Sequence, residues 1–441
     1  MRRRPYLLAG TALLTAGLAA APSLLASPAT AGASKSPTVV TFWESHSAAN
    51  QQGHAIADIV RTFEEANPSI KVEVTVTPAS AKALAAVEAG DPPVMAMIGH
   101  GPQYGYEKAG ALVNLHSFIY GKSGVPSAQL NGIWKGVWNA ELTPTHQQYL
   151  FPVDVKVAEY FYNANIWHKA GLTKAPTTWA QLEADAGQIQ KRTGDIGLAV
   201  RMDHNDWLPQ LYSNGGSLLQ RGSSTKLALD SPAMATTIAQ LQHRDGAPGV
   251  KVISGYNTSL ADFGSGKIGI LENTADGYEM VREDVGGKFP VGVFGVPIGT
   301  TGKAYTLYQG LSFVIFSHAT SAEQQAAWKF IKYFDSPAGQ ATWAVVGGEP
   351  PISTADIPAV EKQAGSRWSA NPGPFAGTAV AIAELEQGTT IHKIIGPAQS
   401  EVDGVIQTQI QKVLQQGLSP STAMKAMEAQ GNAFLSGQAV A

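Results

Sequence analysis

The sequence has no cysteine, little charge and only one long apolar run. Without cysteine the chain forms no disulfide, no thiolate catalyst and no cysteine-based metal site, and no lipid anchor attaches to a cysteine after an export signal. Only 15% of the 441 residues are charged, and the mature part has no basic tract of the kind that binds nucleic acid. A large apolar core must therefore stabilise the chain, and this length permits two or more domains.

The single long apolar run lies at the N-terminus and is typical of an export signal. Three arginines at residues 2–4 precede an Ala/Leu-rich run at 6–25, and small residues then allow cleavage after Ala31 or Ala33. The alternative is a membrane anchor, but proline and serine interrupt the run early. We predict a signal peptide at residues 1–33 that directs export by the general or the twin-arginine route. We expect the mature protein in the periplasm or the extracellular cell-surface space, without a lipid anchor.

The first mature residues predict a β-α-β unit. "PTVVTFW" at 37–43 reads as a buried strand, "AIADIVRTFEEANP" has apolar residues at helical spacing, and "IKVEVTV" at 70–76 alternates as a strand does. A strand, a helix and a strand over this length predict a parallel sheet covered by helices. Ligands of such sheets bind beyond the carboxyl ends of the strands, where Trp43 and Glu44 end the first one.

The stretch "FGSGKIGILEN" at 263–273 has the G-x-G-x-x-G spacing of dinucleotide-binding loops. In those loops a strand precedes the glycines and a helix follows them, so that the pyrophosphate meets the helix N-terminus. Here the helical pattern comes first and the strand pattern second. We therefore interpret the glycines as a turn from a helix into a strand and not as a nucleotide site.

Six stretches in order carry a resemblance that covers nearly the whole mature chain. They are "VTFWES…FEEANPSIKVEV", "VAEYFYNANIWHKAGLTKAPTTWAQL", "ADFGSGKIGILEN", "FPVGVFGVPIG", "SFVIFS…SAEQQAAWKFIKYFDSPAGQATWAVVGGEPPIS" and a helical tail with "LSPSTAMKAME". With them the sequence resembles the extracellular solute-binding proteins of ABC importers (family 1 type), a family with carbohydrate-binding and glycerol-3-phosphate-binding branches.

The resemblance implies an α/β, two-lobed periplasmic-binding-protein fold of type II, like that of maltose-binding protein. Each lobe would have a mostly parallel sheet flanked by helices, and about three segments would cross a hinge between them. We expect the N-terminal lobe to comprise 34–152 and 271–317, and the C-terminal lobe 153–270 and 318–441. Ligand would bind between the lobes and favour their closure, and an ABC permease in the membrane would recognise the closed form.

Sugars are held by aromatic rings against their apolar faces and by carboxylates or amides that accept their hydroxyls. Residues of these kinds lie at the predicted cleft edges, and among them Trp207 is the strongest candidate for stacking because aspartates and an asparagine surround it. The predicted ligand-binding set is Trp43, Glu44, His100, Asp154, Trp207, Glu272, Asn273, Asp276, Tyr278, Tyr308, Gly310 and Glu349.

Along its length the chain is most similar to the glycerol-3-phosphate-binding branch, but the implied pocket differs. His100 stands where that branch has a glutamate, Glu349 stands where it has a tyrosine, and its phosphate-binding arginine has no clear counterpart between residues 388 and 405. We therefore expect a neutral sugar or polyol, with glycerol-3-phosphate and glycerophosphodiesters as the alternative.

A secreted glycosidase or other hydrolase is the rival class, but the sequence contains no G-x-S-x-G and no H-E-x-x-H motif. We expect a binding protein without catalysis, cofactor or metal. We also expect a monomer whose partners are a small-molecule ligand and a membrane permease.

Overall fold

The protein is described here from a computed structural model. The structure describes residues 36–100, 103–142, 147–223, 225–253, 256–368, 370–387, 390–391 and 398–437, and the part from Pro37 onwards forms one compact unit. The predicted signal peptide at 1–33 lies outside the described residues. Within the described ranges, no helix has both the length and the apolar character needed to cross a bilayer.

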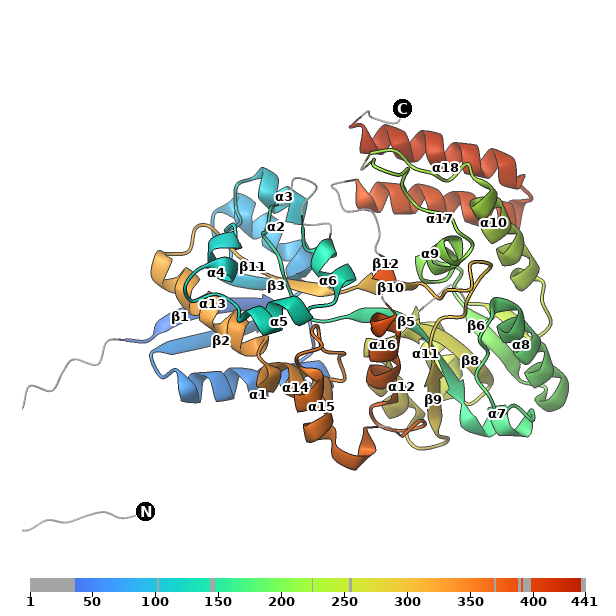
Figure 1. The fold of residues 1–441 in the computed structure, drawn as a ribbon, viewed down its shortest axis with the longest axis horizontal. Coiled ribbons are helices and arrows are strands. Elements are labelled where there is room, and N and C mark those ends of the chain that lie inside the picture. Colours follow the sequence, from blue (N-terminus) through green and yellow to red (C-terminus); the bar gives the residue numbers. More distant parts are fainter. Residues whose placement is uncertain are drawn as a thin grey trace, which may run out of the picture. The chain divides into compact units, whose positions relative to one another are not determined.

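The first sheet has the strand order β2-β1-β3-β11-β4 (Figure 1). Its strands are β1 (Thr38–Glu44), β2 (Ile70–Val76), β3 (Met95–Gly99), β4 (Phe151–Pro152) and β11 (Leu311–Ile315). Its helices are α1 (Gln51–Ala66), α2 (Ala79–Ala89), α3 (Gln103–Lys108), α4 (His116–Tyr120), α5 (Ser127–Gly132), α6 (Lys135–Ala140), α13 (Ser321–Phe334), α14 (Pro337–Gly347) and α15 (Ile357–Ala364). Separate apolar clusters cover its two faces.

The predicted β-α-β unit is confirmed as β1, α1 and β2. The two strands are parallel and in register from Thr38 opposite Ile70 to Glu44 opposite Val76. Helix α1 begins after Asn50, whose side-chain oxygen accepts a hydrogen bond from the Gly53 amide at 2.8 Å. The register brings the carboxyl end of β1, with Glu44, to the edge of the sheet where ligands of parallel sheets bind.

The second sheet has the order β12-β10-β5-β8-β6-β7, and β9 also pairs with β5. Its strands are β5 (Lys156–Asn163), β6 (Ile196–Val200), β7 (Val250–Val252), β8 (Ile268–Thr274), β9 (Val291–Phe294), β10 (Thr306–Gln309) and β12 (Thr390–Ile391). Its helices are α7 (Ala164–Lys169), α8 (Trp179–Thr193), α9 (His204–Ser213), α10 (Pro232–Asp245), α11 (Tyr256–Gly264), the 3-10 helix η1 (Ala275–Gly277), α12 (Tyr278–Val285), α16 (Ala376–Glu386), α17 (Gln399–Gln416) and α18 (Pro420–Leu435).

Both sheets are mixed, whereas the resemblance implied mostly parallel ones. Strand β11 runs antiparallel to β3 and β4, and β5 runs antiparallel to β8, β9 and β10. Both strands enter their sheet straight from the other lobe without a helical crossover. Parallel pairing with the preceding strand requires such a crossover, so a strand that arrives directly is free to run the other way.

Over its described residues the chain passes between the sheets three times, which agrees with the expected number of crossings. The passages are the segment between β4 and β5, the turn at Gly310 between β10 and β11, and the stretch between α15 and α16 that includes the 3-10 helix η2 (Gly365–Arg367).

Strand pairing divides the chain differently from the predicted lobes. Strands β8 to β10, within the predicted N-terminal segment 271–317, pair in the second sheet. Helices α13 and α14, within the predicted C-terminal segment 318–441, pack on β1 and α1 of the first sheet, and α15 packs on α14. The cause is that the second crossing occurs at Gly310 and the third only after α15, whereas the prediction put them near 271 and 317.

The glycine-rich stretch is the turn that its sequence predicts, between α11 and β8. Gly266 has φ of +81°, a left-handed conformation that glycine adopts at no steric cost. At Gly269 an added Cβ would lie 2.8 Å from the Ile189 side chain and 3.1 Å from the Gly197 carbonyl oxygen. The third glycine therefore lets β8 approach α8 and β6 closely, which is a packing role.

Two carboxyl groups are buried on β5 and α16, within the second lobe. Burial raises the pKa of Glu384 to about 8, although a hydrogen bond from the Val296 amide opposes the shift. Burial, and then the charge of Glu384, raises the pKa of Glu159 well above its usual range. Neither Glu159 oxygen has a hydrogen-bond partner among the described residues. Both groups therefore favour the protonated form in the folded protein.

We expect Glu384→Gln to flatten the dependence of stability on pH. An unfolded glutamate has a pKa of about 4.3, so between about pH 5 and 8 the folded chain keeps a proton that the unfolded chain has lost. The unfolded state then binds fewer protons, and the free energy of unfolding falls by about 1.4 kcal/mol per pH unit for this group. Urea unfolding at several pH values measures the slope.

The control for this experiment is Glu386→Gln, an exposed position on the same helix. For Glu386→Gln the free energy of unfolding should change with pH at the same slope as for the wild type. Equal slopes for wild type and Glu384→Gln would show that the buried carboxyl of Glu384 does not hold its proton above pH 5.

Candidate functional site

Two of the three crossings meet at Asp154 and Gly310. The Asp154 side chain is fully buried, and its Oδ1 accepts a hydrogen bond from the Leu311 amide at 2.6 Å. A Cβ on Gly310 would lie 2.7 Å from the Asp154 carbonyl oxygen and 2.6 Å from the Tyr308 hydroxyl. The two crossing segments are thus held against one another, and glycine is required for their close approach.

Lys156 links Asp154 to the second lobe. Its Nζ lies 3.8 Å from Asp154 Oδ2 and 3.2 Å from Asp276 Oδ2 in η1. Burial by itself would raise the pKa of Asp276, but the charge of Lys156 and hydrogen bonds from Thr274, Lys156 and the backbone together lower it by more, so that the pKa lies below its usual value. Asp276 is therefore ionised at neutral pH, and Lys156 is its partner.

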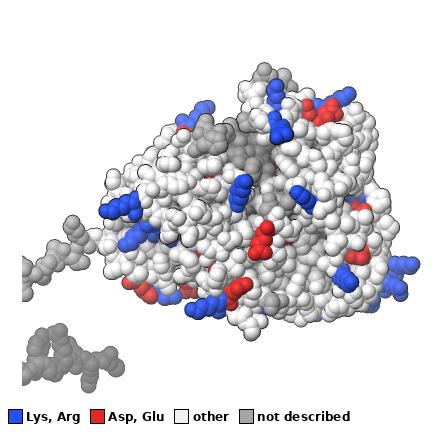
Figure 2. Space-filling model, viewed as in Figure 1, with Lys and Arg blue, Asp and Glu red and all other residues white. Residues whose placement is uncertain are grey.

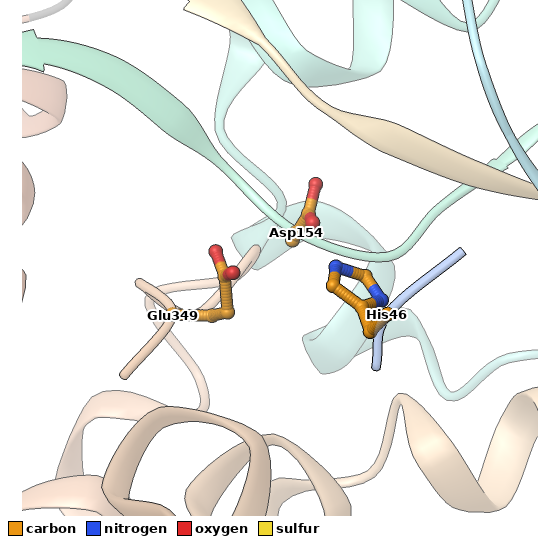
Figure 3. Close-up of side chains that lie close together, drawn as sticks. All are labelled: His46, Asp154 and Glu349. Atoms are coloured by element: carbon orange, nitrogen blue, oxygen red, sulfur yellow. The ribbon is translucent and has the colours of Figure 1, made fainter. Parts of the chain in front are cut away.

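The first lobe brings three further polar side chains to this crossing. His46, in the loop after β1, donates its backbone amide to Glu44 Oε2 at 2.5 Å, and its ring Nδ1 lies 3.1 Å from the same oxygen. Glu349, in the turn after α14, is fully buried and accepts from the Gln52 side-chain amide at 3.2 Å. One ligand atom each of His46, Asp154 and Glu349 lies within 4.8 Å of the other two (Figure 3).

A second polar group spans the lobes beside the crossing. His100 Nε2 lies 3.0 Å from Glu141 Oε1, and the Tyr308 hydroxyl of the second lobe donates to the same oxygen at 3.3 Å. Burial lowers the pKa of His100, but the charge of Glu141, its hydrogen bond and the charge of Asp154 together raise it by more, and the net pKa is above the ordinary value. Glu141 thus accepts hydrogen bonds from both lobes.

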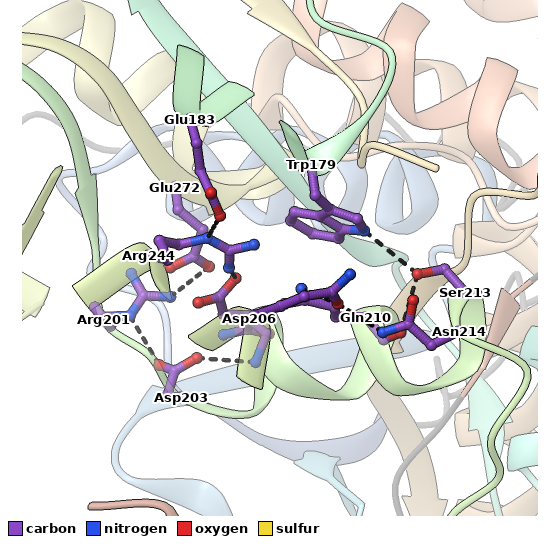
Figure 4. Close-up of polar contacts among 12 residues, drawn as sticks. Trp179, Glu183, Arg201, Asp203, Asp206, Gln210, Ser213, Asn214, Arg244 and Glu272 are labelled. Atoms are coloured by element: carbon purple, nitrogen blue, oxygen red, sulfur yellow. Dashed lines mark hydrogen bonds and ion pairs between the residues drawn. The ribbon is translucent and has the colours of Figure 1, made fainter. Parts of the chain in front are cut away.

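Glu272 and Asn273 lie near the carboxyl end of β8 in the second lobe. Glu272 Oε1 lies 3.2 Å from Arg201 Nη2, and Arg201 Nε lies 2.8 Å from Asp203 Oδ2 (Figure 4). Burial raises the pKa of Glu272 to about 8, while the charge of Arg201 opposes the shift. Asn273 is fully buried, and its Oδ1 accepts from the Thr274 amide.

Two predicted aromatic residues occupy core positions and not open cleft edges. Trp207 is only 1% exposed and packs with Leu208 and Leu211 in the main apolar cluster of the second lobe. The Tyr278 ring is 2% exposed, and its hydroxyl donates to the Val291 and Gly373 carbonyl oxygens. The expected stacking role of Trp207 therefore does not match its position. Trp43 is partly buried beside β3 and α2.

Several residues of this region are missing from the predicted set. Lys156 and His46 each stand two positions after a predicted residue, Asp154 and Glu44. Side chains at i and i+2 of an extended segment share a face, so this spacing was the available signal. The contact between Glu141 and His100, 41 residues apart, carries no such signal, and neither does the contact between Arg201 and Glu272, 71 residues apart.

Comparison with known proteins identifies the family. Residues 58–373 match the family described as bacterial extracellular solute-binding protein. The chain belongs to this family. A putative binding protein of Brucella abortus (strain 2308) is 23% identical over 331 residues, which is 72% of this chain and 76% of that protein.

Solved structures of similar proteins show the same fold. The cyclic alpha-maltosyl-1,6-maltose binding protein of Arthrobacter globiformis has a TM-score of 0.76 at 19% identity, over 91% of this chain and 100% of that one. Maltose-bound MalE3 of T. maritima has a TM-score of 0.72 at 19% identity, over 89% of this chain and 99% of that one. The two-lobed fold predicted from the sequence is thereby confirmed.

Proposed function

We propose that this solute-binding protein captures a neutral sugar or oligosaccharide between its lobes and delivers it to an ABC permease. The named relatives of this fold bind maltose or a cyclic maltosyl-maltose, which supports a carbohydrate ligand here. On this proposal the protein performs no chemistry on its ligand and acts as a monomer outside the cytoplasmic membrane, in keeping with its extracellular family.

Unpaired polar atoms among the predicted site residues carry this proposal. Each of six residues has a buried side-chain oxygen or nitrogen without a hydrogen-bond partner among the described residues: Asp154, Trp207, Glu272, Asn273, Asp276 and Glu349. Buried polar groups are nearly always hydrogen-bonded, so such a concentration requires an explanation. Sugar hydroxyls both donate and accept hydrogen bonds, and they match a mixture of carboxyl and amide groups.

The cations near these residues disfavour a phosphorylated ligand. Lys156 is paired with Asp154 and Asp276, Arg201 with Asp203 and Glu272, and Arg244 with Asp206 and Glu183. A phosphate would have to take a cation from carboxylates that would then lie buried and unpaired. On the face shown in Figure 2, lysines and arginines lie apart or in small groups near the edges, interspersed with acidic residues, and form no broad basic patch that would attract anions.

The three crossings support a hinge between the lobes. Few residues would need to change conformation, and the crossing segments include Gly310, Gly365 and Gly373. A ligand shifts the lobes toward the closed form only if it binds that form more tightly than it binds the open form. We place the lobe boundaries where strand pairing changes: near 153, at 310, and between α15 and α16.

We expect the purified chain to bind a neutral oligosaccharide saturably and almost independently of salt. A thermal-shift and calorimetry panel would include maltose, maltotriose, cyclic glucans, monosaccharides, polyols, glycerol-3-phosphate and glycerophosphocholine, in about 50 mM and 500 mM salt. A ligand bound through hydroxyls should show little change in Kd between the two salt concentrations. If glycerol-3-phosphate alone stabilises the protein, and does so less at high salt, the ligand is a phosphate compound and not a sugar.

Glu272→Gln tests the site within the same assay. Replacing one carboxyl oxygen with an amide nitrogen leaves a buried hydrogen-bonding group unsatisfied, which costs about 1–3 kcal/mol, so we expect the affinity for the sugar found in the panel to fall about 5- to 150-fold. Glu65→Gln, whose side chain is 65% exposed on α1, is the matched control and should bind as the wild type does. Equal affinity in all three proteins would remove Glu272 from the site.

A further inference from the structure

His46, Asp154 and Glu349 come from three separate segments and converge at one point. His46 lies in the loop after β1, Asp154 on the first crossing and Glu349 in the turn after α14 (Figure 3). One ring nitrogen and one oxygen from each carboxyl group lie within 4.8 Å of one another. The two carboxyl groups are fully buried, so solvent does not separate the three groups as it does in surface clusters of acidic residues.

The histidine is oriented by a carboxylate behind it. Glu44 is 1% exposed, and its Oε2 lies 3.1 Å from His46 Nδ1 while also accepting the His46 amide. With a proton on Nδ1 for this hydrogen bond, the other ring nitrogen, Nε2, is left with its lone pair. Metal-binding histidines are commonly held in this way, by a carboxylate on the nitrogen that does not bind the metal.

Each of the two carboxyl groups has one oxygen that accepts a hydrogen bond from the protein and one that accepts none. Asp154 Oδ1 accepts from the Leu311 amide, and Glu349 Oε1 accepts from the Gln52 side chain. Asp154 Oδ2 and Glu349 Oε2 are buried without a hydrogen-bond partner among the described residues. The oxygen that is held fixes the orientation of the group, and the other oxygen is free to bind a cation.

We propose that His46, Asp154 and Glu349 bind a divalent transition-metal ion, with zinc the best match, where the first lobe meets the crossing. Zinc accepts both imidazole nitrogen and carboxylate oxygen as ligands, and water would complete a tetrahedral site. Zinc bonds of about 2.0–2.2 Å place such ligands roughly 3.4 Å apart, so the side chains would move inward by about 1 Å. Calcium prefers six to eight oxygen ligands and fits this set poorly.

The ammonium group of Lys156 competes with a metal ion for the Asp154 carboxylate. Its Nζ lies 3.8 Å from Asp154 Oδ2, so a bound metal would take Asp154 from the ammonium group and leave Lys156 with Asp276 at 3.2 Å. Removing the ammonium group would make the site more negative without changing a ligand. Zinc affinity should therefore rise when Lys156 is replaced by a neutral residue of similar length.

Calorimetric titration of the untagged, chelator-treated chain with zinc chloride tests the proposal. The wild type should bind one equivalent, and His46→Ala and Glu349→Gln should weaken binding by about 100-fold. Glu44→Gln should weaken it about 10-fold, within the range known for partners of metal-binding histidines. Lys156→Met should tighten it about 10-fold, a gain that a misfolded variant cannot produce. Calcium chloride should give no comparable binding.

The matched control is His243→Ala. His243 lies 2.8 Å from Glu183, but its side chain is 74% exposed, and it should not contribute to the zinc site. Without metal, urea unfolding should show Glu349→Gln to be at least as stable as the wild type, because it removes one of several crowded carboxylates. The proposal fails if the wild type binds no zinc, or if all variants bind it equally. Sugar titrations in excess chelator test the proposed function separately.

Discussion

Trp207→Ala is expected to lower the free energy of unfolding by about 3–5 kcal/mol, the usual cost of removing a large aromatic side chain from a core. The indole is 1% exposed and packs among leucines of the second lobe's main apolar cluster. Truncation leaves a cavity that close-packed neighbours fill only in part. Urea unfolding followed by far-UV circular dichroism measures the loss.

Trp43→Ala is the comparison for this experiment. Trp43 is only partly buried at the edge of a smaller cluster, so its replacement should cost clearly less stability than that of Trp207. A stacking role for Trp207 would produce the opposite pattern: wild-type stability and a loss of sugar affinity. That result would show that the lobes open far enough to expose the ring.

The case of Trp207 shows where sequence reasoning reaches its limit. Polar neighbours at 203, 205 and 206 suggested an open edge, but each of them has a structural task. Asp203 caps α9 by accepting the Asn205 amide at 2.9 Å, and Asp206 pairs with Arg244, 38 residues away. A local pattern shows which residues are polar, but it does not show which distant residue satisfies them.

Local patterns were sufficient for the elements themselves. The β-α-β unit followed from helical spacing and alternation, and the glycine turn followed from the order of helix and strand. Lobe membership depends instead on which strands pair over long distances. Strand β8 pairs with β5, more than 100 residues earlier, and no short window of sequence contains that information.

The same distinction applies to the site. Glu44, Asp154 and Glu349 were predicted from their places at strand ends and turns, and the structure brings Asp154 and Glu349 together with His46. What the sequence did not reveal is that Lys156 and Arg201 neutralise neighbouring carboxylates. These ion pairs bear on the choice between sugar and phosphate, and they form only once the second sheet is assembled.

Arg244→Met is expected to lower the free energy of unfolding by about 3–5 kcal/mol, because it leaves a buried carboxylate without its partner. Arg244 and Asp206 are both 0% exposed, and Arg244 Nη1 lies 2.5 Å from Asp206 Oδ1 (Figure 4). The guanidinium also lies 4.8 Å from the centre of the Trp179 ring, and its Nε lies 3.0 Å from Glu183 Oε1. Urea unfolding of the single variant measures the cost.

The double variant Arg244→Met/Asp206→Leu separates the charge from the packing. With both charges removed, no ion lies buried and unpaired, and apolar side chains of similar size fill the space. We expect the double variant to regain most of the stability that Arg244→Met loses. Arg61→Met, at an exposed ion pair on α1, should leave stability unchanged within error. A double variant no more stable than Arg244→Met would mean that the packing of Arg244 on Trp179, and not its charge, supports this part of the lobe.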